Sequence, residues 1–214
     1  MIYSLNEIEA LARKAARGSG LSWGLAEEAG KAVRWLCANG FQGTELLTKL
    51  LSANDGKPYS DLAPQQIDDV WRARSGMLCP IILGALICDR ADELGRGEPI
   101  KVGEVAMPLM LAPFASHAAR SAGVTVTLEW QGAKLTLDGG APGVQGDEAA
   151  LHAARTTSVT LSQTDAAIFR SVPTERGRQL TPEILKTLEA FAQRTYAPAT
   201  EASRAGAGAE TDDD

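Results

Sequence analysis

The sequence predicts an α+β fold in which a helical N-terminal half packs against a small, mostly antiparallel sheet and further helices. Apolar residues recur at helical spacing through the first third of the chain, and a period-two hairpin pattern occurs near its middle. Helical patterns then return on both sides of that hairpin. We expect residues 1–197 to form one domain, helical over about 1–95 and mixed over about 96–197.

The N-terminal third carries signals for the ends of three helices. Ser4 and Glu7 stand three residues apart, as in a capping box, and apolar residues follow at helical spacing. Ser22 is placed to cap a second helix. Thr44 is placed to cap a third, short helix that ends at an Asn-Asp-Gly turn.

The middle of the chain is punctuated by proline and glycine. Residues 54–66 are polar and contain two prolines, which predicts a loop between the two halves. A helix is expected from about Gln65 to Arg74. Pro80 can then occupy the first turn of a long buried helix that runs to Leu94.

The second half alternates between strand and helix signals. PIKVGEVAMP predicts a short strand, and LAPFASHAARSAG predicts an alanine-rich helix that ends at Gly123. In VTVTLEWQGAKLTLDGG, apolar and polar residues alternate on both sides of a Gln-Gly turn, which predicts a β-hairpin with one buried face. TTSVTLSQ predicts a strand that pairs with this hairpin or lies at a sheet edge. Thr181-Pro182 begins the last helix.

Composition and charge disfavour several functional classes. The net charge is −6 over 214 residues, but residues 198–214 hold five acidic residues and one arginine. This tail, which we expect to be disordered, therefore carries −4, and about −2 remains for the folded body. Because no basic patch is present, nucleic acid is disfavoured as a partner. The apolar runs are shorter than the roughly 20 residues that span a bilayer, so no membrane segment is expected.

The three cysteines and the N-terminal residues indicate a cytoplasmic protein. An odd number of cysteines without CxxC spacing does not predict a disulfide framework. MIYSLNEIEALARK lacks the basic and apolar regions of a signal peptide. We therefore expect a reducing compartment.

Cys79 and His117 are the candidate catalytic residues. Cys79 directly precedes Pro80, and a helix N-terminus there could stabilise a thiolate. Its neighbours are apolar, however, which favours an inert core side chain at Cys79. A Cys–His pair would require about 3 Å between His117 and the thiol. His152 lies next to a predicted loop and is expected to be the more exposed histidine. The two histidines have no zinc-binding spacing, so no metal is expected.

Arg72 and Arg74 are the candidate ligand-binding residues, together with Ser75 and Asp89. The two guanidinium groups precede a Ser-Gly turn and a helix start, where they could hold a carboxylate or a phosphate. Asp89 is expected to share a helix face with Asp92, which could bind a cation or act as an acid–base pair, or be a solvated helix end. Because neither phosphate-binding glycine motif is present, no cofactor is expected.

Three stretches resemble a family of proteobacterial proteins of unknown function: SLNEIEALARKAARGSGLSWGLAEEAGKAVRWLCANGFQG, CPIILGALICD and PLMLAPFASHAA. The resemblance covers most of residues 1–195 and implies a soluble bacterial protein. It implies no activity, so no catalytic residue is assigned from it.

The paired N-terminal helices are also similar to the start of the malate/L-lactate dehydrogenase family that has a non-Rossmann fold. In that family the following turn carries a Ser-His-Gly motif, whereas the comparable NGFQGTELL has no histidine here. The chain is also short for that fold. We therefore interpret this similarity as shared helix pairing and not as an indication of dehydrogenase activity.

The sequence favours two functional hypotheses. The first is a protein that binds a small anionic metabolite or a partner protein, with alanine-rich and tryptophan-bearing helices that could form a homodimer. The alternative is a small cofactor-independent lyase, isomerase or hydrolase. In that case Cys79 or His117 would act as nucleophile or acid–base group, and Arg72 and Arg74 would hold the substrate. The enzyme hypothesis requires these side chains to converge on one pocket.

Overall fold

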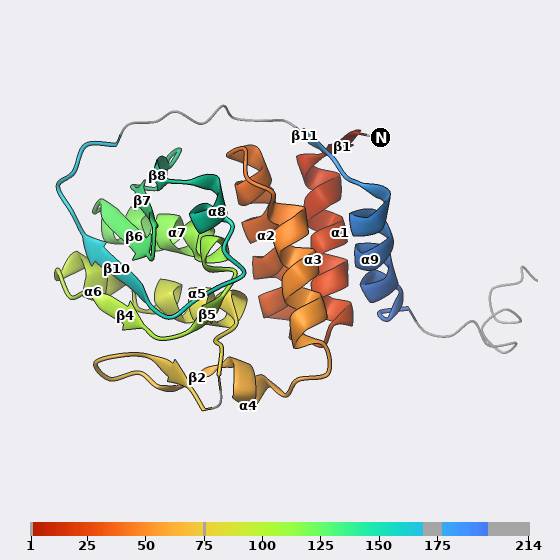
Figure 1. Cartoon of the computed structure of the whole chain (residues 1–214), viewed down its shortest axis with the longest axis horizontal. Helices are drawn as coiled ribbons and strands as arrows, with labels where there is room; N and C mark the ends of the chain where they lie inside the picture. The colour runs from red at the N-terminus through yellow and green to blue at the C-terminus, as the bar shows by residue number, and fades with distance from the viewer. Residues whose placement is uncertain (1, 75, 169–176, 197–214) are drawn as a thin grey trace, which may run out of the picture.

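The computed structural model describes residues 2–74, 76–168 and 177–196. A group of helices stands on one side of the molecule, and a sheet with its own covering helices stands on the other (Figure 1). This arrangement confirms the predicted α+β class with a helical N-terminal half. The predicted disordered tail, 198–214, lies outside the described residues. Every helix in the described ranges is too short or too polar to cross a membrane.

Four helices form the helical side. They are α1 (Leu5–Gly18), α2 (Trp23–Ala38), α3 (Gly43–Asn54) and the last helix, α9 (Pro182–Gln193). Helix α9 packs on α1 and α3, so the last described helix lies beside the first (Figure 1). Small residues allow this close packing: a Cβ at Gly18 would collide with the carbonyl oxygen of Phe191.

The predicted caps are confirmed for α1 and α2 and wrong for α3. Ser4 Oγ accepts a hydrogen bond from the backbone N–H of Glu7, whose carboxylate accepts one from the Ser4 N–H at 2.7 Å. Ser22 caps α2 in the predicted way. Thr44 instead lies buried inside the first turn of α3. This helix begins earlier because Gly43 fits closely against α2, where a Cβ would lie 2.9 Å from the Leu36 Cβ.

The predicted helix at 65–74 is wrong. After a single turn of helix, α4 (Tyr59–Leu62), the chain forms two short antiparallel strands, β2 (Pro64–Gln66) and β3 (Arg72–Ala73). The buried Trp71 anchors this segment through its backbone. Its backbone N–H donates to the Lys101 carbonyl at 2.9 Å, and its carbonyl accepts from the Gly103 N–H at 2.9 Å. Long-range backbone pairing therefore outweighs weak local helix preference.

The long helix predicted from Pro80 to Leu94 is divided. Helix α5 (Pro80–Asp89) begins with proline as predicted, but Arg90 leaves helical geometry and a short helix, α6 (Ala91–Gly95), follows. Asp89 and Asp92 therefore do not share one continuous helix. Asp92 forms an ion pair with Arg96 on α6.

The central sheet has five strands, all paired antiparallel in the order β4-β10-β6-β7-β8. Their bounds are β4 (Ile100–Val102), β6 (Val126–Trp130), β7 (Ala133–Leu137), β8 (Gly143–Gly146) and β10 (Val159–Gln163). The predicted hairpin is confirmed as β6–β7, with the buried Leu128 opposite Leu135. Strand β10 pairs with this hairpin, as one alternative predicted, and lies inside the sheet.

Helix α7 (Ala112–Ala122) follows a 3₁₀ turn, η1 (Pro108–Leu111), and packs on β6 and β7. It ends at Gly123 as predicted, and Gly123 takes the left-handed conformation of a helix C-cap, with φ of 69°. Helix α7 also contacts α5 and α2. It therefore joins the sheet to the helical side of the molecule.

Several short elements were not predicted individually, and PIKVGEVAMP, which predicts one short strand, contains both β4 and β5. Strands β1 (Ile2–Ser4) and β11 (Gly177–Gln179) pair antiparallel, as do β5 (Val105–Ala106) and β9 (Arg155–Thr156). A single-turn helix, α8 (Glu148–Leu151), links β8 to β9 and is capped by Asp147. Each strand pair joins segments far apart in the chain, so its partner cannot be identified from a local pattern.

Candidate functional site

Three of the predicted site residues, Cys79, His117 and Asp89, line two cavities of similar size. The first, called here the apolar pocket, has a volume of about 470 Å³ and contains Cys79 in its wall. The second, called here the polar pocket, has a volume of about 460 Å³ and contains both His117 and Asp89. The structure thus brings His117 and Asp89 together and places Cys79 in a different cavity.

The predicted anion-binding arginines belong to neither of these two cavities. Arg72 lies on β3, where its side chain packs against Gly103, and Arg74 follows that strand. Both are exposed, and neither side chain forms a hydrogen bond or ion pair with other described residues. Ser75 lies outside the described residues. An anion site at Arg72 and Arg74 stays a prediction, separate from the two cavities.

The apolar pocket lies where the α1–α2 turn, the end of α3, α4 and the start of α5 meet. Its wall consists mainly of aliphatic side chains: Leu21, Leu25, Leu50, Leu51, Leu62, Ile81 and Ile82. Its polar lining residues are few and come mostly from helix ends and turns: Ser19, Ser22, Asn54, Lys57 and Tyr59. Such a cavity favours a ligand with an apolar body and few polar groups.

Cys79 is part of this wall and is only 2% exposed. Its backbone is fixed on both sides, because its N–H donates to the Leu62 carbonyl at 3.0 Å and its carbonyl accepts from the Leu83 N–H at 3.0 Å. Burial raises the pKa of the thiol, an effect that the nearby amides at the start of α5 and the side chain of Asn54 oppose. The neutral thiol therefore serves as an apolar surface of the pocket.

Lys57 is the only charged side chain among the described residues that line the apolar pocket. Its ammonium group is exposed and forms no hydrogen bond or ion pair with the described part of the chain, while its backbone N–H donates to the Asn54 carbonyl. The nearby acid, Asp55, is held by Arg194 at 2.7 Å and 3.0 Å. Arg194 holds the pKa of the Asp55 carboxyl below its usual range.

The helix dipoles add little to the electrostatic potential at the apolar pocket, which Lys57 makes positive. Two helices, α2 and α5, begin at the apolar pocket, and two others, α1 and α3, end there. Their partial charges have opposite signs and largely offset one another. Lys57 was not among the predicted site residues. The only local signal at Lys57 is its position directly after the Asn54-Asp55-Gly56 turn.

The polar pocket lies between α2, α5, α7 and the residues that follow β7. Its charged and titratable side chains come from three helices: Glu28 and Lys31 from α2, Asp89 from α5, and His117 and Arg120 from α7. Its apolar wall is formed by Ala32, Trp35, Ala85, Pro113 and Phe114. Cys88 and Ser116 also line it.

Three of the charged groups in the polar pocket, Glu28, Lys31 and Arg120, are held by neighbours. Lys31 Nζ lies 2.7 Å from Glu28 Oε1, and this contact raises the pKa of Lys31. The guanidinium of Arg120 donates to the carbonyl of Gly139. Gly139 has φ of 91°, and a Cβ there would collide with the Arg120 side chain. The chain between β7 and β8 therefore holds Arg120 in place.

The other two groups, His117 and Asp89, are uncommitted: within the described residues, neither side chain forms a hydrogen bond or ion pair. Cys88 is not a ready nucleophile, because burial, Glu28 and Asp89 raise the pKa of its thiol to about 12. The described residues also contain no group of three or more His, Cys, Asp or Glu side chains that could hold a metal ion.

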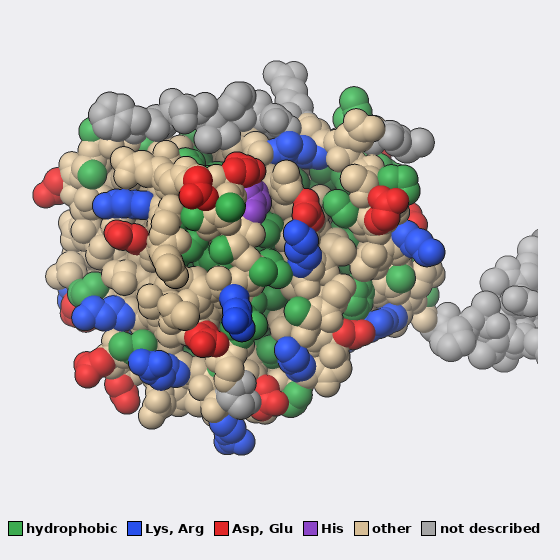
Figure 2. Space-filling model, in the orientation of Figure 1, with side chains coloured by type: hydrophobic (Ala, Val, Ile, Leu, Met, Phe, Trp, Pro, Cys, Tyr) green, Lys and Arg blue, Asp and Glu red, His purple; other side chains and the backbone are tan. Residues whose placement is uncertain are grey.

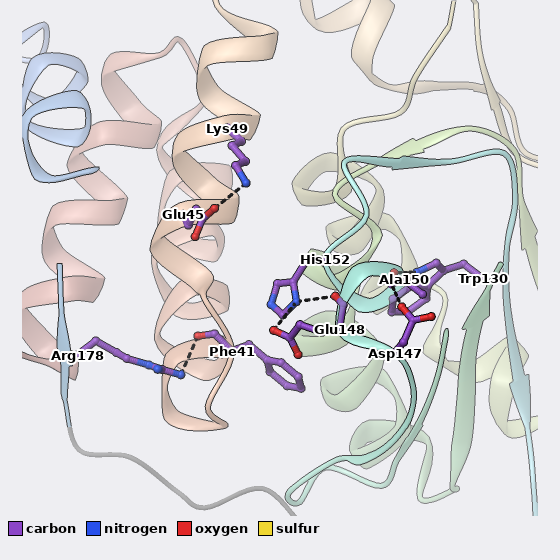
Figure 3. Close-up of polar contacts among 9 residues, drawn as sticks. All are labelled: Phe41, Glu45, Lys49, Trp130, Asp147, Glu148, Ala150, His152 and Arg178. Atoms are coloured by element: carbon purple, nitrogen blue, oxygen red, sulfur yellow. Dashed lines mark hydrogen bonds and ion pairs between the residues drawn. The ribbon is translucent and has the colours of Figure 1, made fainter. Parts of the chain in front are cut away.

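The expectation that His152 is the more exposed histidine is wrong. The His152 side chain is 20% exposed, whereas His117 is classed among the exposed residues. His152 projects from the end of α8 toward α3, and its Nδ1 lies 3.1 Å from both the backbone carbonyl and the carboxylate of Glu148 (Figure 3). Trp130 Nε1 donates to the Ala150 carbonyl at 2.8 Å and ties α8 to the sheet. His152 is therefore a packing residue.

Acidic and basic side chains alternate over the face shown in Figure 2, with no broad region of one sign. Ion pairs on the described surface include Glu45 with Lys49, which lie on the side of α3 that faces α8 (Figure 3). Surface pairs of this kind contribute little to stability.

Comparisons with known proteins give a family match over part of the chain and no activity. Residues 3–78 match the model of the family described as "Protein of unknown function (DUF3726)", which confirms over these residues the predicted resemblance to a family of unknown function. No curated protein matches the chain. Among solved structures, the chain is similar to malate dehydrogenase from Entamoeba histolytica at 12% identity and a TM-score of 0.47. That similarity covers 68% of this chain and 49% of the other, so this chain spans about half the length of that structure.

Proposed function

We propose that the protein binds a small molecule with an apolar body and one carboxylate in the apolar pocket. The observation that supports this function is the position of Lys57, a single cation without a partner in the described chain, at a cavity lined by seven aliphatic side chains. An unbranched fatty acid of medium length is the simplest molecule of this class. This assignment develops the hypothesis of a small anionic metabolite and moves its binding site from Arg72 and Arg74 to Lys57.

The size of the cavity and the chemistry of its wall set the expected affinity. A volume of about 470 Å³ lies within the range of small-molecule sites. Each buried methylene contributes about 0.8 kcal/mol, so each added methylene should lower Kd about fourfold until the pocket is filled. Chain length, rather than charge, should therefore determine most of the affinity.

Lys57 contributes selectivity. Because its ammonium group is exposed, an ion pair with a ligand carboxylate is worth at most about 1 kcal/mol, or about fivefold in Kd. A carboxylate should therefore bind better than the alcohol of the same length. An amine should bind worse than both, because its charge would face Lys57.

Isothermal titration calorimetry with decanoate, decanol and decylamine tests this function. The Lys57→Met variant retains the aliphatic stem and removes the charge, and it should bind decanoate about fivefold more weakly with decanol unchanged. Lys49→Met is the matched control, since Lys49 is a nearby lysine on α3 that pairs with Glu45 and does not line the pocket. Equal binding of the three ligands, or no binding of any of them, would refute the proposal.

We also propose that the protein is cytoplasmic and bacterial, and that it forms a homodimer. The absence of disulfides among Cys37, Cys79 and Cys88 supports a reducing compartment. Trp23 supports self-association, because it is 68% exposed at the start of α2, next to Arg17 at 5.0 Å. Light scattering after size-exclusion chromatography should give a dimer mass, and Trp23→Ser should give a monomer.

The alternative of a small enzyme is supported only in the polar pocket. His117 and Asp89 line that cavity together, whereas Cys79, Arg72 and Arg74 do not. An enzyme would therefore use His117 as its acid–base group, without the thiol and without the arginines that the sequence suggested. Activity that is lost in His117→Gln and retained in Cys79→Ala would favour this alternative.

A further inference from the structure

We infer that the polar pocket is a second binding site, for a zwitterion that carries both an ammonium and a carboxylate group on an apolar body. A free α-amino acid with an aromatic or large aliphatic side chain belongs to this class. The inference concerns a different cavity from the proposed carboxylate site, so an experiment can refute one of the two sites without affecting the other.

The charges in the cavity are balanced. Glu28 and Asp89 contribute two carboxylates, Lys31 and Arg120 contribute two cations, and His117 adds an imidazole. A simple anion would meet two carboxylates there, and a simple cation would meet the lysine and the arginine. A ligand with one charge of each sign can satisfy both sets.

The uncommitted groups show which ligand group each side of the cavity would take. Glu28 and Lys31 already neutralise each other at 2.7 Å. Asp89, which has no partner within the described chain, is the available acceptor for an ammonium group. On the facing helix, α7, His117 is uncommitted, and Arg120 uses its guanidinium for Gly139 while retaining further N–H donors. These two side chains are the available donors for a carboxylate.

The apolar wall would hold the body of the ligand. Trp35 and Phe114 supply aromatic surfaces, and Ala32 and Ala85 are small residues of the same wall. Trp35 is itself stacked on Phe41, with ring centroids 6.3 Å apart. The cavity of about 460 Å³ accommodates an amino acid of the size of phenylalanine.

The walls of the cavity are also closely packed, which favours selective binding. A Cβ on Gly84 would enter the ring of Phe114, so α5 and α7 are in direct contact behind the wall. Gly139 holds Arg120 from the other side. A preformed site loses less conformational entropy when its ligand binds.

The test compares four ligands that share a phenethyl body and carry different charged groups: phenylalanine, N-acetylphenylalanine, phenylalanine amide and phenethylamine. Chemical-shift titrations in the full chain should give the lowest Kd for phenylalanine. Losing either the ammonium or the carboxylate charge should raise Kd about fivefold, because the side chains that would pair with these charges are exposed. Similar Kd values for all four ligands, or no phenylalanine binding at millimolar concentration, would overturn the inference.

Two variants locate the binding site. Asp89→Asn should raise the Kd of phenylalanine about fivefold and should not raise that of N-acetylphenylalanine, since the latter has no ammonium group. Asp92→Asn is the matched control, because Asp92 is a nearby acid that pairs with Arg96 and does not line the cavity. His117→Gln should weaken the binding of phenylalanine and of N-acetylphenylalanine, the two ligands that carry a carboxylate. An unchanged phenylalanine Kd in Asp89→Asn and His117→Gln would refute this site.

Discussion

Asp55 and Arg194 join the end of α3 to the end of α9 through two hydrogen bonds of 2.7 Å and 3.0 Å. The pair fixes the last helix to the helical side of the molecule. It also removes the acid that lies two residues before Lys57 from competition for that cation. The ion pair therefore helps to keep Lys57 available at the apolar pocket.

Arg194→Met should weaken decanoate binding even though Arg194 does not line the pocket. In this variant Asp55 loses its partner and can attract the nearby Lys57. The rise in decanoate Kd should be smaller than in Lys57→Met and should disappear in Asp55→Asn/Arg194→Met. Calorimetry on the three proteins checks this, and a decrease in affinity that persists in the double variant would contradict it.

The Asp55–Arg194 pair should also make stability depend on pH in one direction. Because Arg194 lowers the pKa of Asp55 in the folded state, the pair stabilises the protein above the unfolded-state pKa of the carboxyl. This stabilisation is lost as the pH falls through the lower, folded-state pKa. Thermal denaturation across the acidic range should show a shallower fall in Tm for Asp55→Asn than for the wild type, and parallel curves would contradict the account.

Gly84→Ala should destabilise the protein and disturb the polar pocket. The new Cβ would overlap the ring of Phe114, which is buried, so the expected loss is about 1–3 kcal/mol of unfolding free energy. Gly24→Ala is the matched helix control, because nothing lies within 4 Å of its Cβ position. It should stabilise the protein by about 0.5–1 kcal/mol. Urea denaturation of the two variants gives both values.

Cys79 should be unreactive in the folded protein. Burial raises the pKa of its thiol, so little thiolate is present at mildly alkaline pH, and the sulfur is also inaccessible. Iodoacetamide should label Cys79 only after urea is added, as read by peptide mass spectrometry. Rapid labelling in the folded state would instead support the thiolate that the sequence suggested before Pro80.

Local signals in the sequence predicted much of the fold. The Ser4–Glu7 capping box, the left-handed Gly123 and the β6–β7 hairpin each depend on residues close in the chain, and each prediction is confirmed. The helix predicted at 65–74 failed because Trp71 pairs with the backbone of Lys101 and Gly103, a contact that no local pattern reveals.

The cavities were harder to predict than the fold, because their walls come from distant segments. His117 and Asp89 were recognised singly, but they share a pocket only because α5 and α7 pack together at Gly84 and Phe114. Lys57 was missed, since a lysine after a turn has no distinctive pattern. Its importance comes from the aliphatic wall beside it, which four separate segments build.

The most direct test of the central proposal is to locate a bound fatty acid by NMR. Decanoate labelled at its terminal methyl group would be added to the methyl-labelled protein at a concentration where it stays monomeric. The proposal predicts nuclear Overhauser contacts from this methyl group to Ile81, Ile82 and Leu62, with the carboxylate near Lys57. Contacts to Trp35 and Phe114 instead, or no intermolecular contacts, would contradict the assignment of the apolar pocket as the ligand site.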